Sequence, residues 1–248
     1  MVYLAFTIPK AFGFEAATRS VWRSLRTMLL YAEHVLRARP WAVEDDHTAK
    51  KLAQLGLLIA VFGVMYGGVM GSFGGVFGER FWQVVFSAVK VPFLLTGTFA
   101  LSLPSFFVVN TLFGLRSDFS YSLRALLATQ AGLTIVLASF APFTVLWYVS
   151  FSNYRGAILF NTLMFGSASL TAQWLLRRFY EPLIQRNRRH RTLLRAWLVI
   201  YAFVGIQMAW VLRPFIGNPD APTQFFRQDA WGNAYVRLAN IILSFVGG

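Results

Sequence analysis

The chain contains no cysteine among its 248 residues, and only 13% of those residues are charged. Without cysteine it has no disulfide framework, no thiolate metal site and no cysteine nucleophile. Acidic residues are also scarce, at 10 Asp and Glu against 23 Lys and Arg. In contrast, 56% of the residues are hydrophobic, 17% are aromatic, and the mean hydropathy is +0.53. This composition is typical of an integral membrane protein.

Long apolar runs define the fold class. A hydrocarbon core of about 30 Å needs about 20 mostly apolar helical residues. Because the backbone of such a run must satisfy its own hydrogen bonds in lipid, each run is predicted to be a helix. The sequence therefore predicts an all-α, polytopic transmembrane helical bundle with about five spans. The five runs are Leu52–Phe73, Val91–Phe113, Ala125–Ser150, Ala157–Leu176 and Ala196–Leu212.

Two amphipathic helices are expected outside the spans. From Glu15 to Arg39, apolar residues recur at spacings of three and four, and arginines lie largely between them. This pattern predicts a helix in the membrane interface, although packing on a partner or on the protein's own spans gives the same pattern. A similar spacing after Asp229 predicts an outer C-terminal helix, with a sixth span over 230–246 as the alternative. The expected organisation is a cytoplasmic segment 1–51, a five-span domain 52–213 and an outer segment 214–248.

Basic residues are distributed unevenly around the runs. If the N-terminus is cytoplasmic, segments 1–51, 114–124 and 177–195 hold 8, 2 and 7 of the 23 Lys and Arg residues. Positive residues in short loops stay cytoplasmic, which favours this orientation.

The densest basic group is a topology determinant in our interpretation, and we expect it also to contact anionic phospholipids. No recognition element or stacking aromatic surface accompanies it, so nucleic-acid binding is not expected. The group consists of Arg186, Arg188, Arg189, Arg191 and Arg195.

Glycine recurs at every fourth position in the first run, at Gly63, Gly67, Gly71 and Gly75. Small residues at this spacing form a groove where another helix can approach closely. We expect the groove to pack against another helix of the same chain rather than against a second copy.

A possible intramembrane polar site comprises Lys90, Asn110 and Asn161. Lys90 begins the second span, and we expect its side chain to reach the outer headgroups, with an acidic partner such as Glu79 as the alternative. The two amides are expected to make hydrogen bonds between helices.

No catalytic or metal-binding residue is predicted. All ten acidic residues and all three histidines lie outside the five runs, so proton relays and intramembrane haem or zinc sites have no candidates. No phosphate-cradling, metalloprotease or hydrolase motif occurs in a supporting context. No cofactor is required, whereas a bound lipid is compatible with the apolar spans.

Part of the chain resembles the Yip1-type family of five-span membrane proteins. The resemblance rests on a cytoplasmic segment before closely spaced helices and on the stretch LPSFFVVNTLFGLRSDFSYSLRALLATQAGL. It covers roughly residues 52–213 in architecture, and the aspartate-leucine-tyrosine-glycine-proline motif of eukaryotic members is absent. The resemblance implies a helical scaffold that interacts with other membrane proteins, and it transfers no functional residue.

The sequence thus predicts a non-enzymatic integral membrane subunit or scaffold that packs against partner proteins in a bacterial inner membrane. The alternative is a permease-like transporter subunit for lipid or an apolar solute. In that case the loop near 114–124 would contact a cytoplasmic ATPase.

Overall fold

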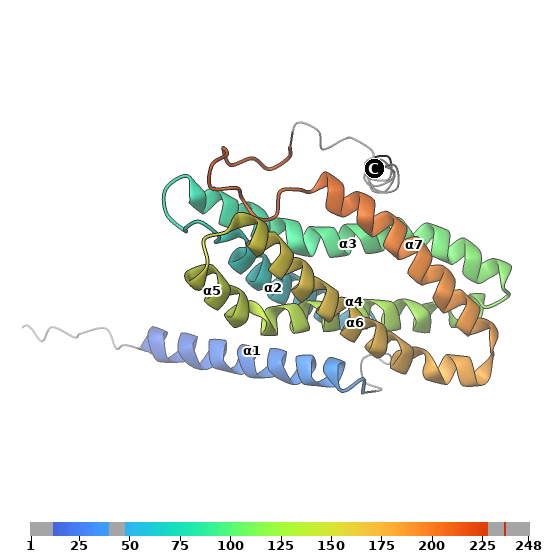
Figure 1. The fold of residues 1–248 in the computed structure, drawn as a ribbon. Coiled ribbons are helices and arrows are strands. Elements are labelled where there is room, and N and C mark those ends of the chain that lie inside the picture. Colours follow the sequence, from blue (N-terminus) through green and yellow to red (C-terminus); the bar gives the residue numbers. More distant parts are fainter. Residues whose placement is uncertain (1–11, 40–47, 228–235, 237–248) are drawn as a thin grey trace, which may run out of the picture.

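The computed structural model describes residues 12–39, 48–227 and Val236, and within them every regular element is a helix (Figure 1). The all-α prediction is confirmed for this part of the chain. The predicted C-terminal helix after Asp229 lies outside the described residues. The elements in chain order are α1 (Phe12–Leu36), α2 (Thr48–Gly71), α3 (Arg80–Leu112), η2 (Arg116–Asp118), α4 (Phe119–Ser139), α5 (Ala141–Ser150), α6 (Tyr154–Arg186) and α7 (Arg189–Val211).

Four helical segments of the described chain are long and apolar enough to cross a membrane, and they cover most of four of the five predicted runs. The fifth run lies in α6. This helix is long enough to cross a membrane, but Asn161, Gln173 and several Ser and Thr residues lower its mean hydropathy. Large apolar side chains remain exposed on the bundle, as expected for surfaces that face lipid. Leu112, for example, is 80% exposed. The four segments are Ala49–Gly71, Arg80–Leu112, Arg116–Ser150 and Arg189–Val211.

The glycines of α2 lie against α3. A Cβ atom added to Gly63 would stand 3.1 Å from Pro92 Cβ, and one added to Gly71 would stand 2.7 Å from the Gln83 carbonyl oxygen. Gly67 approaches the α3 backbone equally closely. Gly75 does not belong to this groove, because α2 ends at Gly71 and Gly75 adopts a φ of +123° with nothing near its Cβ position. Three of the four predicted groove residues therefore pack the α2–α3 pair.

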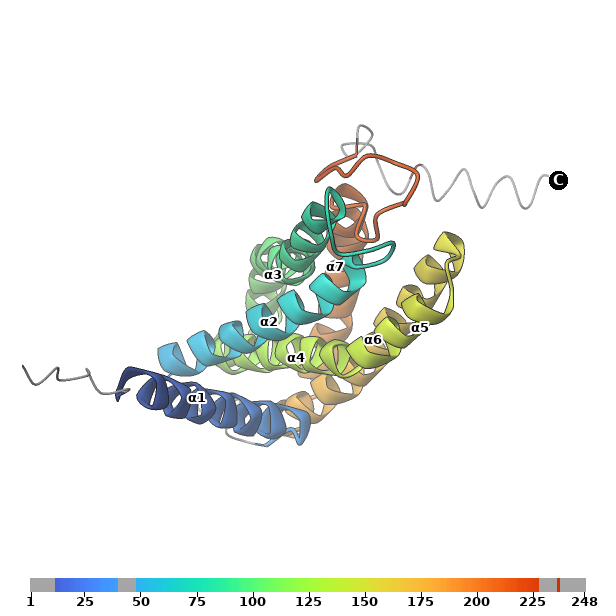
Figure 2. The ribbon, with the colours of Figure 1, turned by 90° about the vertical axis from the view of Figure 1, so that its left-hand side faces the viewer.

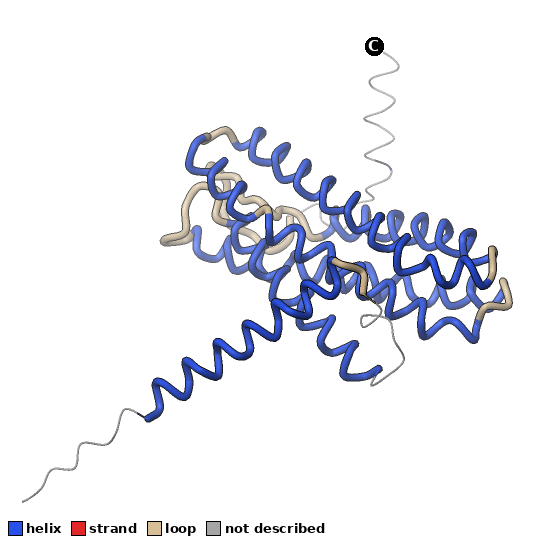
Figure 3. The backbone as a smooth tube through the Cα atoms, turned by 90° about the horizontal axis from the view of Figure 1, so that it is seen from below, coloured by secondary structure: helices blue, strands red, loops and turns tan. Residues whose placement is uncertain are grey.

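Helix α1 has two halves with different surroundings. Near its C-terminus, Ala32 and Val35 are buried in the main apolar cluster. Towards its N-terminus, Val21 is 57% exposed and Trp22 is 71% exposed. This first half extends away from the bundle when the molecule is seen from below (Figure 3). The helix ends at Leu36, three residues before the predicted boundary, and Ala38 just beyond it has a φ of +49°.

The two ends of the bundle are built from different segments. At one, here called the loop end, residues 212–227 fold back beside the starts of α3 and α6 (Figures 1 and 2). At the other, here called the arginine end, α3 is joined to α4 by the turn around η2 and α6 is joined to α7 at Asn187. Between the ends, the Trp197 ring packs against Phe99 and Phe106, with centroids 5.8 and 5.0 Å apart.

Candidate functional site

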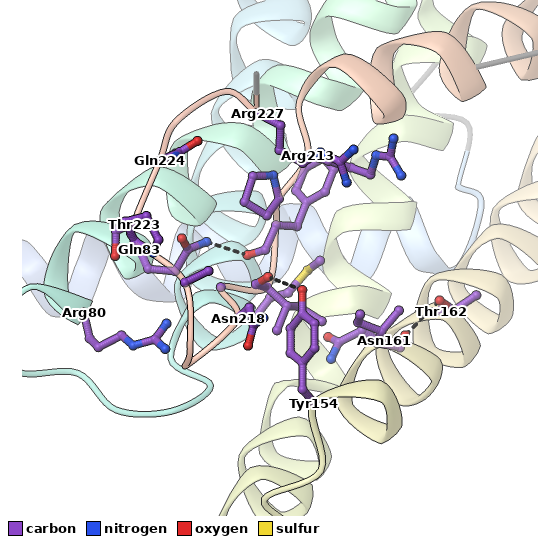
Figure 4. A pocket seen from close by; sticks show the side chains of 18 of the residues that line it. Arg80, Gln83, Tyr154, Asn161, Thr162, Arg213, Asn218, Thr223, Gln224 and Arg227 are labelled. Carbon is purple, nitrogen blue, oxygen red and sulfur yellow. Dashed lines mark hydrogen bonds between the residues drawn. The ribbon is translucent and has the colours of Figure 1, made fainter. Parts of the chain in front are cut away.

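The loop after α7 is attached to the bundle through three successive carbonyl groups. Lys90 Nζ donates to the Pro214 oxygen at 2.7 Å. Gln83 Nε2 donates to the Phe215 oxygen at 3.1 Å, and Ser87 Oγ donates to the same oxygen. The Tyr154 hydroxyl donates to the Ile216 oxygen at 3.3 Å. Side chains from α3 and α6 thus fix the path of the loop, and Figure 4 shows the Gln83 and Tyr154 contacts.

Lys90 has neither of the environments considered from the sequence. Its side chain is fully buried, so it does not extend to a headgroup layer, and its ammonium binds a backbone carbonyl rather than Glu79. The ammonium also lies 4.8 Å from the centroid of the Phe225 ring, which comes from the same loop. A carbonyl and an aromatic face are both favourable partners for a buried cation. Lys90 therefore holds the loop in place.

A pocket of about 640 Å³ lies beneath this loop, between the loop, the start of α3 and the first half of α6. Its volume is within the range of about 300–1,000 Å³ that is usual for small-molecule sites. Three arginines and no acidic residue occur among the described residues that line it: Arg80, Arg213 and Arg227. Leu94, Ile158 and Phe165 form an apolar wall.

Arg80 and Gln83 contribute polar atoms to the pocket that are buried and lack hydrogen-bond partners in the described chain. Both terminal nitrogens of Arg80 are buried, and they have no hydrogen-bond partner within the described part of the chain. Gln83 is fully buried, and its Oε1 has no partner there either. A Cβ atom on Gly217 would stand 2.9 Å from both Arg80 Nη1 and Gln83 Cδ. The loop can pass this close to the two side chains because residue 217 is glycine.

A hydrogen-bonded network supports the α6 side of the pocket. Asn161, which lines the pocket, accepts from the Tyr66 hydroxyl at 3.0 Å and donates to the Tyr148 hydroxyl at 2.7 Å. Tyr148 in turn donates to the Met70 carbonyl at 3.1 Å. Tyr154 at the start of α6 is a neutral donor, since burial raises the pKa of its phenol while Arg227 and Arg80 lower it by less.

The three residues of the predicted intramembrane polar site do not form one site. Lys90 and Asn161 both support the loop end, but Asn110 lies two residues before the end of α3, near the arginine end. The Asn110 side chain is fully buried, and neither of its amide atoms has a partner among the described residues. Polar residues of the apolar runs can therefore lie at opposite ends of the bundle, and the sequence alone does not show which of them are close together.

At the arginine end, all five residues of the basic cluster Arg186–Arg195 are exposed. Two of them contact the turn between α3 and α4. Arg186 lies 3.6 Å from Asp118, and Arg189 donates to the Phe113 carbonyl at 3.3 Å. His190, within the same stretch, is fully buried and its Nε2 lies 3.0 Å from Asp118 Oδ2. The predicted cluster comprised the five arginines, and the sequence pattern did not indicate that His190 between them is buried.

The sequence contained one usable pattern for the loop-end site. Arg80, Gln83, Ser87 and Lys90 are spaced by three, four and three residues, which places polar side chains on one face of an otherwise apolar helix. The partners of that face are more than a hundred residues away in the chain, and no local pattern identifies them.

The described residues contain no group of three or more His, Cys, Asp and Glu side chains that could hold a metal ion. The groups that line the pocket can bind a ligand through cationic and amide side chains and through apolar side chains. Comparison with family models, with curated proteins and with solved structures finds no match for this chain. The resemblance to the Yip1-type family therefore stays a prediction.

Proposed function

We propose that this protein is a non-enzymatic integral membrane protein that binds an amphiphilic molecule in the loop-end pocket. The observation that carries the proposal is a gradient of polarity along α3, whose lining changes from Arg80 and Gln83 to Leu94. On α6 the apolar lining residues Ile158 and Phe165 flank the polar Asn161 and Thr162.

The gradient has the length scale of an amphiphile. At ~1.5 Å per residue, Arg80 and Leu94 are roughly 20 Å apart along the axis of α3. The polar end lies under the loop, and the apolar end lies further along the membrane-spanning part of the helix. A ligand with a polar head and an apolar tail would place each part against matching groups.

The setting of this function is also part of the proposal. The distribution of basic residues supports an N-terminus and an arginine end that face the cytoplasm of a bacterial inner membrane. The loop-end pocket would then open towards the outer side. In this arrangement the protein holds an amphiphile within a membrane assembly, and packing against partner subunits remains compatible with the exposed first half of α1.

A pair of neighbouring substitutions tests amphiphile binding. Ile158 lines the pocket, whereas Leu159 is 63% exposed and does not line it. We expect Ile158→Trp to fill the pocket and to remove amphiphiles that co-purify in mild detergent, and Leu159→Trp to retain them. Native mass spectrometry of the two variants and the unchanged protein measures this directly. The same retained masses in both variants, or none in the unchanged protein, would contradict the proposal.

The permease-like alternative makes a different prediction. It requires a cytoplasmic ATPase that co-purifies with the chain and whose activity rises when the amphiphile is added. An amphiphile retained without any ATPase companion supports the binding function proposed here.

A further inference from the structure

The basic residues at the loop end need an explanation that topology does not supply. Positive residues on the outer side of a bundle oppose the usual distribution. The sequence places six Lys and Arg residues outside the three segments assigned to the cytoplasm. Four of the six lie in the pocket lining or hold the loop above it: Arg80, Lys90, Arg213 and Arg227.

The three arginines create a positive pocket. Arg213 stacks over the Trp210 ring at 3.3 Å from its centroid, and Arg227 lies 5.9 Å from the same centroid. Arg80 and Arg227 form no ion pair within the described part of the chain. Three arginines that face one cavity, without an acidic side chain among its described lining residues, attract anions.

Arg80 has the geometry of an anchor for an anion. Its terminal nitrogens are buried without a hydrogen-bond partner in the described chain. A buried guanidinium without an acceptor is costly, and an oxyanion bound by two parallel N–H donors removes that cost. The guanidinium lies between two glycines, Gly74 with a φ of +82° and Gly217, so no side chain from either position fills the space beside it.

Gln83 adds a requirement for a donor on the ligand. Its Nε2 already donates to Ser87 Oγ at 3.0 Å and to the Phe215 carbonyl. These two bonds fix the orientation of the amide, because only the nitrogen can donate. The remaining Oε1 is a buried acceptor without a partner among the described residues. A hydroxyl group on the ligand would satisfy it.

We propose that the loop-end pocket recognises an oxyanion headgroup of the phosphate-ester class that also carries a hydroxyl group. Arg80 anchors the phosphate, Gln83 accepts from the hydroxyl, and Arg213 and Arg227 supply the surrounding positive charge. The apolar wall at Leu94, Ile158 and Phe165 receives the chain of the amphiphile. This inference rests on the proposed function, to which it adds the chemical class of the ligand.

Three probes separate the headgroup from the chain and from a soluble anion. They are a single-chain lysophosphatidate, the monoacylglycerol with the same chain, and inorganic phosphate. Binding of each to the full-length protein in detergent is measured by native mass spectrometry and by the shift in thermal unfolding. The variants are Arg80→Gln and Arg80→Lys, with Arg188→Gln at the exposed arginine end as the matched control.

We expect the unchanged protein and Arg188→Gln to bind lysophosphatidate at least about tenfold more tightly than monoacylglycerol, which corresponds to ~1.4 kcal/mol. Arg80→Gln should remove this preference and leave the affinity for monoacylglycerol unchanged. Arg80→Lys should retain part of it, because lysine keeps the charge but not the planar pair of donors. Inorganic phosphate that binds as tightly as lysophosphatidate would support anion recognition and identify a soluble anion as the source.

Two outcomes would overturn the proposals, and they are distinguishable. Equal binding of the two amphiphiles by the unchanged protein and by Arg80→Gln would overturn the headgroup inference and leave the amphiphile pocket in place. If none of the three probes binds to a folded protein, the proposed function itself fails. The unfolding temperature of each variant without ligand shows whether it is folded.

Discussion

The two basic groups of this protein lie at opposite ends of one bundle and differ in their surroundings. The five arginines of the arginine end are close together in the sequence and exposed. The three arginines of the loop-end pocket come from α3 and from the segment after α7, and they line one cavity. Density of charge in the sequence therefore does not identify the site. At Arg80, terminal nitrogens that are buried without an acceptor among the described residues distinguish a binding group from arginines that only face water and headgroups.

The largest effect that we expect is on the orientation of the protein in the membrane, and it should arise from only one of the two basic groups. Replacing the five exposed arginines with glutamine should change a single orientation into a mixture, because the cytoplasmic excess of positive charge is reduced. Arg80→Gln combined with Arg213→Gln and Arg227→Gln should leave the orientation unchanged. The absence of native cysteine allows single cysteines to report the side of the membrane.

The reporters for this comparison are Val76→Cys at the loop end and Gln185→Cys at the arginine end, both at exposed positions. A maleimide that cannot cross membranes is applied to right-side-out and inverted vesicles. The account predicts that labelling of each reporter becomes two-sided only in the five-residue variant. A change of orientation in both variants would show that the loop-end arginines act in topology as well.

The next effect concerns the residue that holds the loop. Lys90→Met removes a buried charge-assisted hydrogen bond to Pro214, which we expect to cost about 1.5–3 kcal/mol of unfolding free energy. Lys50→Met is the control, since Lys50 is exposed at the start of α2. Thermal unfolding in detergent measures the loss, and labelling of Ile216→Cys, at a position that is 5% exposed in the folded loop, should increase as the loop opens. A Met variant that is more stable and keeps the loop protected would show that Lys90 does not hold it.

A similar or smaller effect comes from the glycine contact behind the pocket. Gly71→Ala places a Cβ 2.7 Å from the Gln83 carbonyl and 2.8 Å from Ser87 Oγ, so it should destabilise by about 1–3 kcal/mol and weaken ligand binding. Gly56→Ala lies on the same helix with nothing within 4 Å. The control should be neutral or up to about 1 kcal/mol more stable. Equal unfolding temperatures for the two variants would exclude a tight contact at Gly71.

The smallest effect is expected at the arginine end. Arg186 lies 3.6 Å from Asp118, and its side chain is 74% exposed. Arg186→Gln should therefore change the unfolding free energy by less than about 1 kcal/mol. It should also leave binding in the loop-end pocket unchanged. A loss as large as that of Lys90→Met would remove the distinction between a structural loop end and a solvated arginine end.

The fold was predictable from the sequence to the extent that it depends on local properties. Length without charge identified the apolar helices, and the spacing of Gly63, Gly67 and Gly71 identified the face of α2 that contacts another helix. The run in α6 was predicted as a fifth span, but it is not among the four sufficiently apolar segments of the described chain, because Asn161 and Gln173 make it more polar. Asn161 makes hydrogen bonds to Tyr66 and Tyr148 across the bundle.

The site was not predictable in the same way. Lys90 and Asn161 were recognised as unusual, but their partners depend on how the segment after α7 folds back over α3. Arg80 and Gln83 were not singled out, since an arginine and a glutamine next to a span are common. Their significance comes from atoms that are buried without partners in the described chain, and that property exists only in the folded protein.

The most direct test of the account is to map where an anionic amphiphile contacts the chain. A lysophosphatidate with a photoreactive group midway along its acyl chain is bound to the protein in bilayer nanodiscs, irradiated, and the modified residues are identified by mass spectrometry. The account predicts adducts at Leu94, Ile158 or Phe165 whose yield at a subsaturating lipid concentration decreases in Arg80→Gln. Adducts confined to the arginine end, or spread over lipid-facing residues such as Leu112 and Val199 with the pocket unmodified, would contradict it.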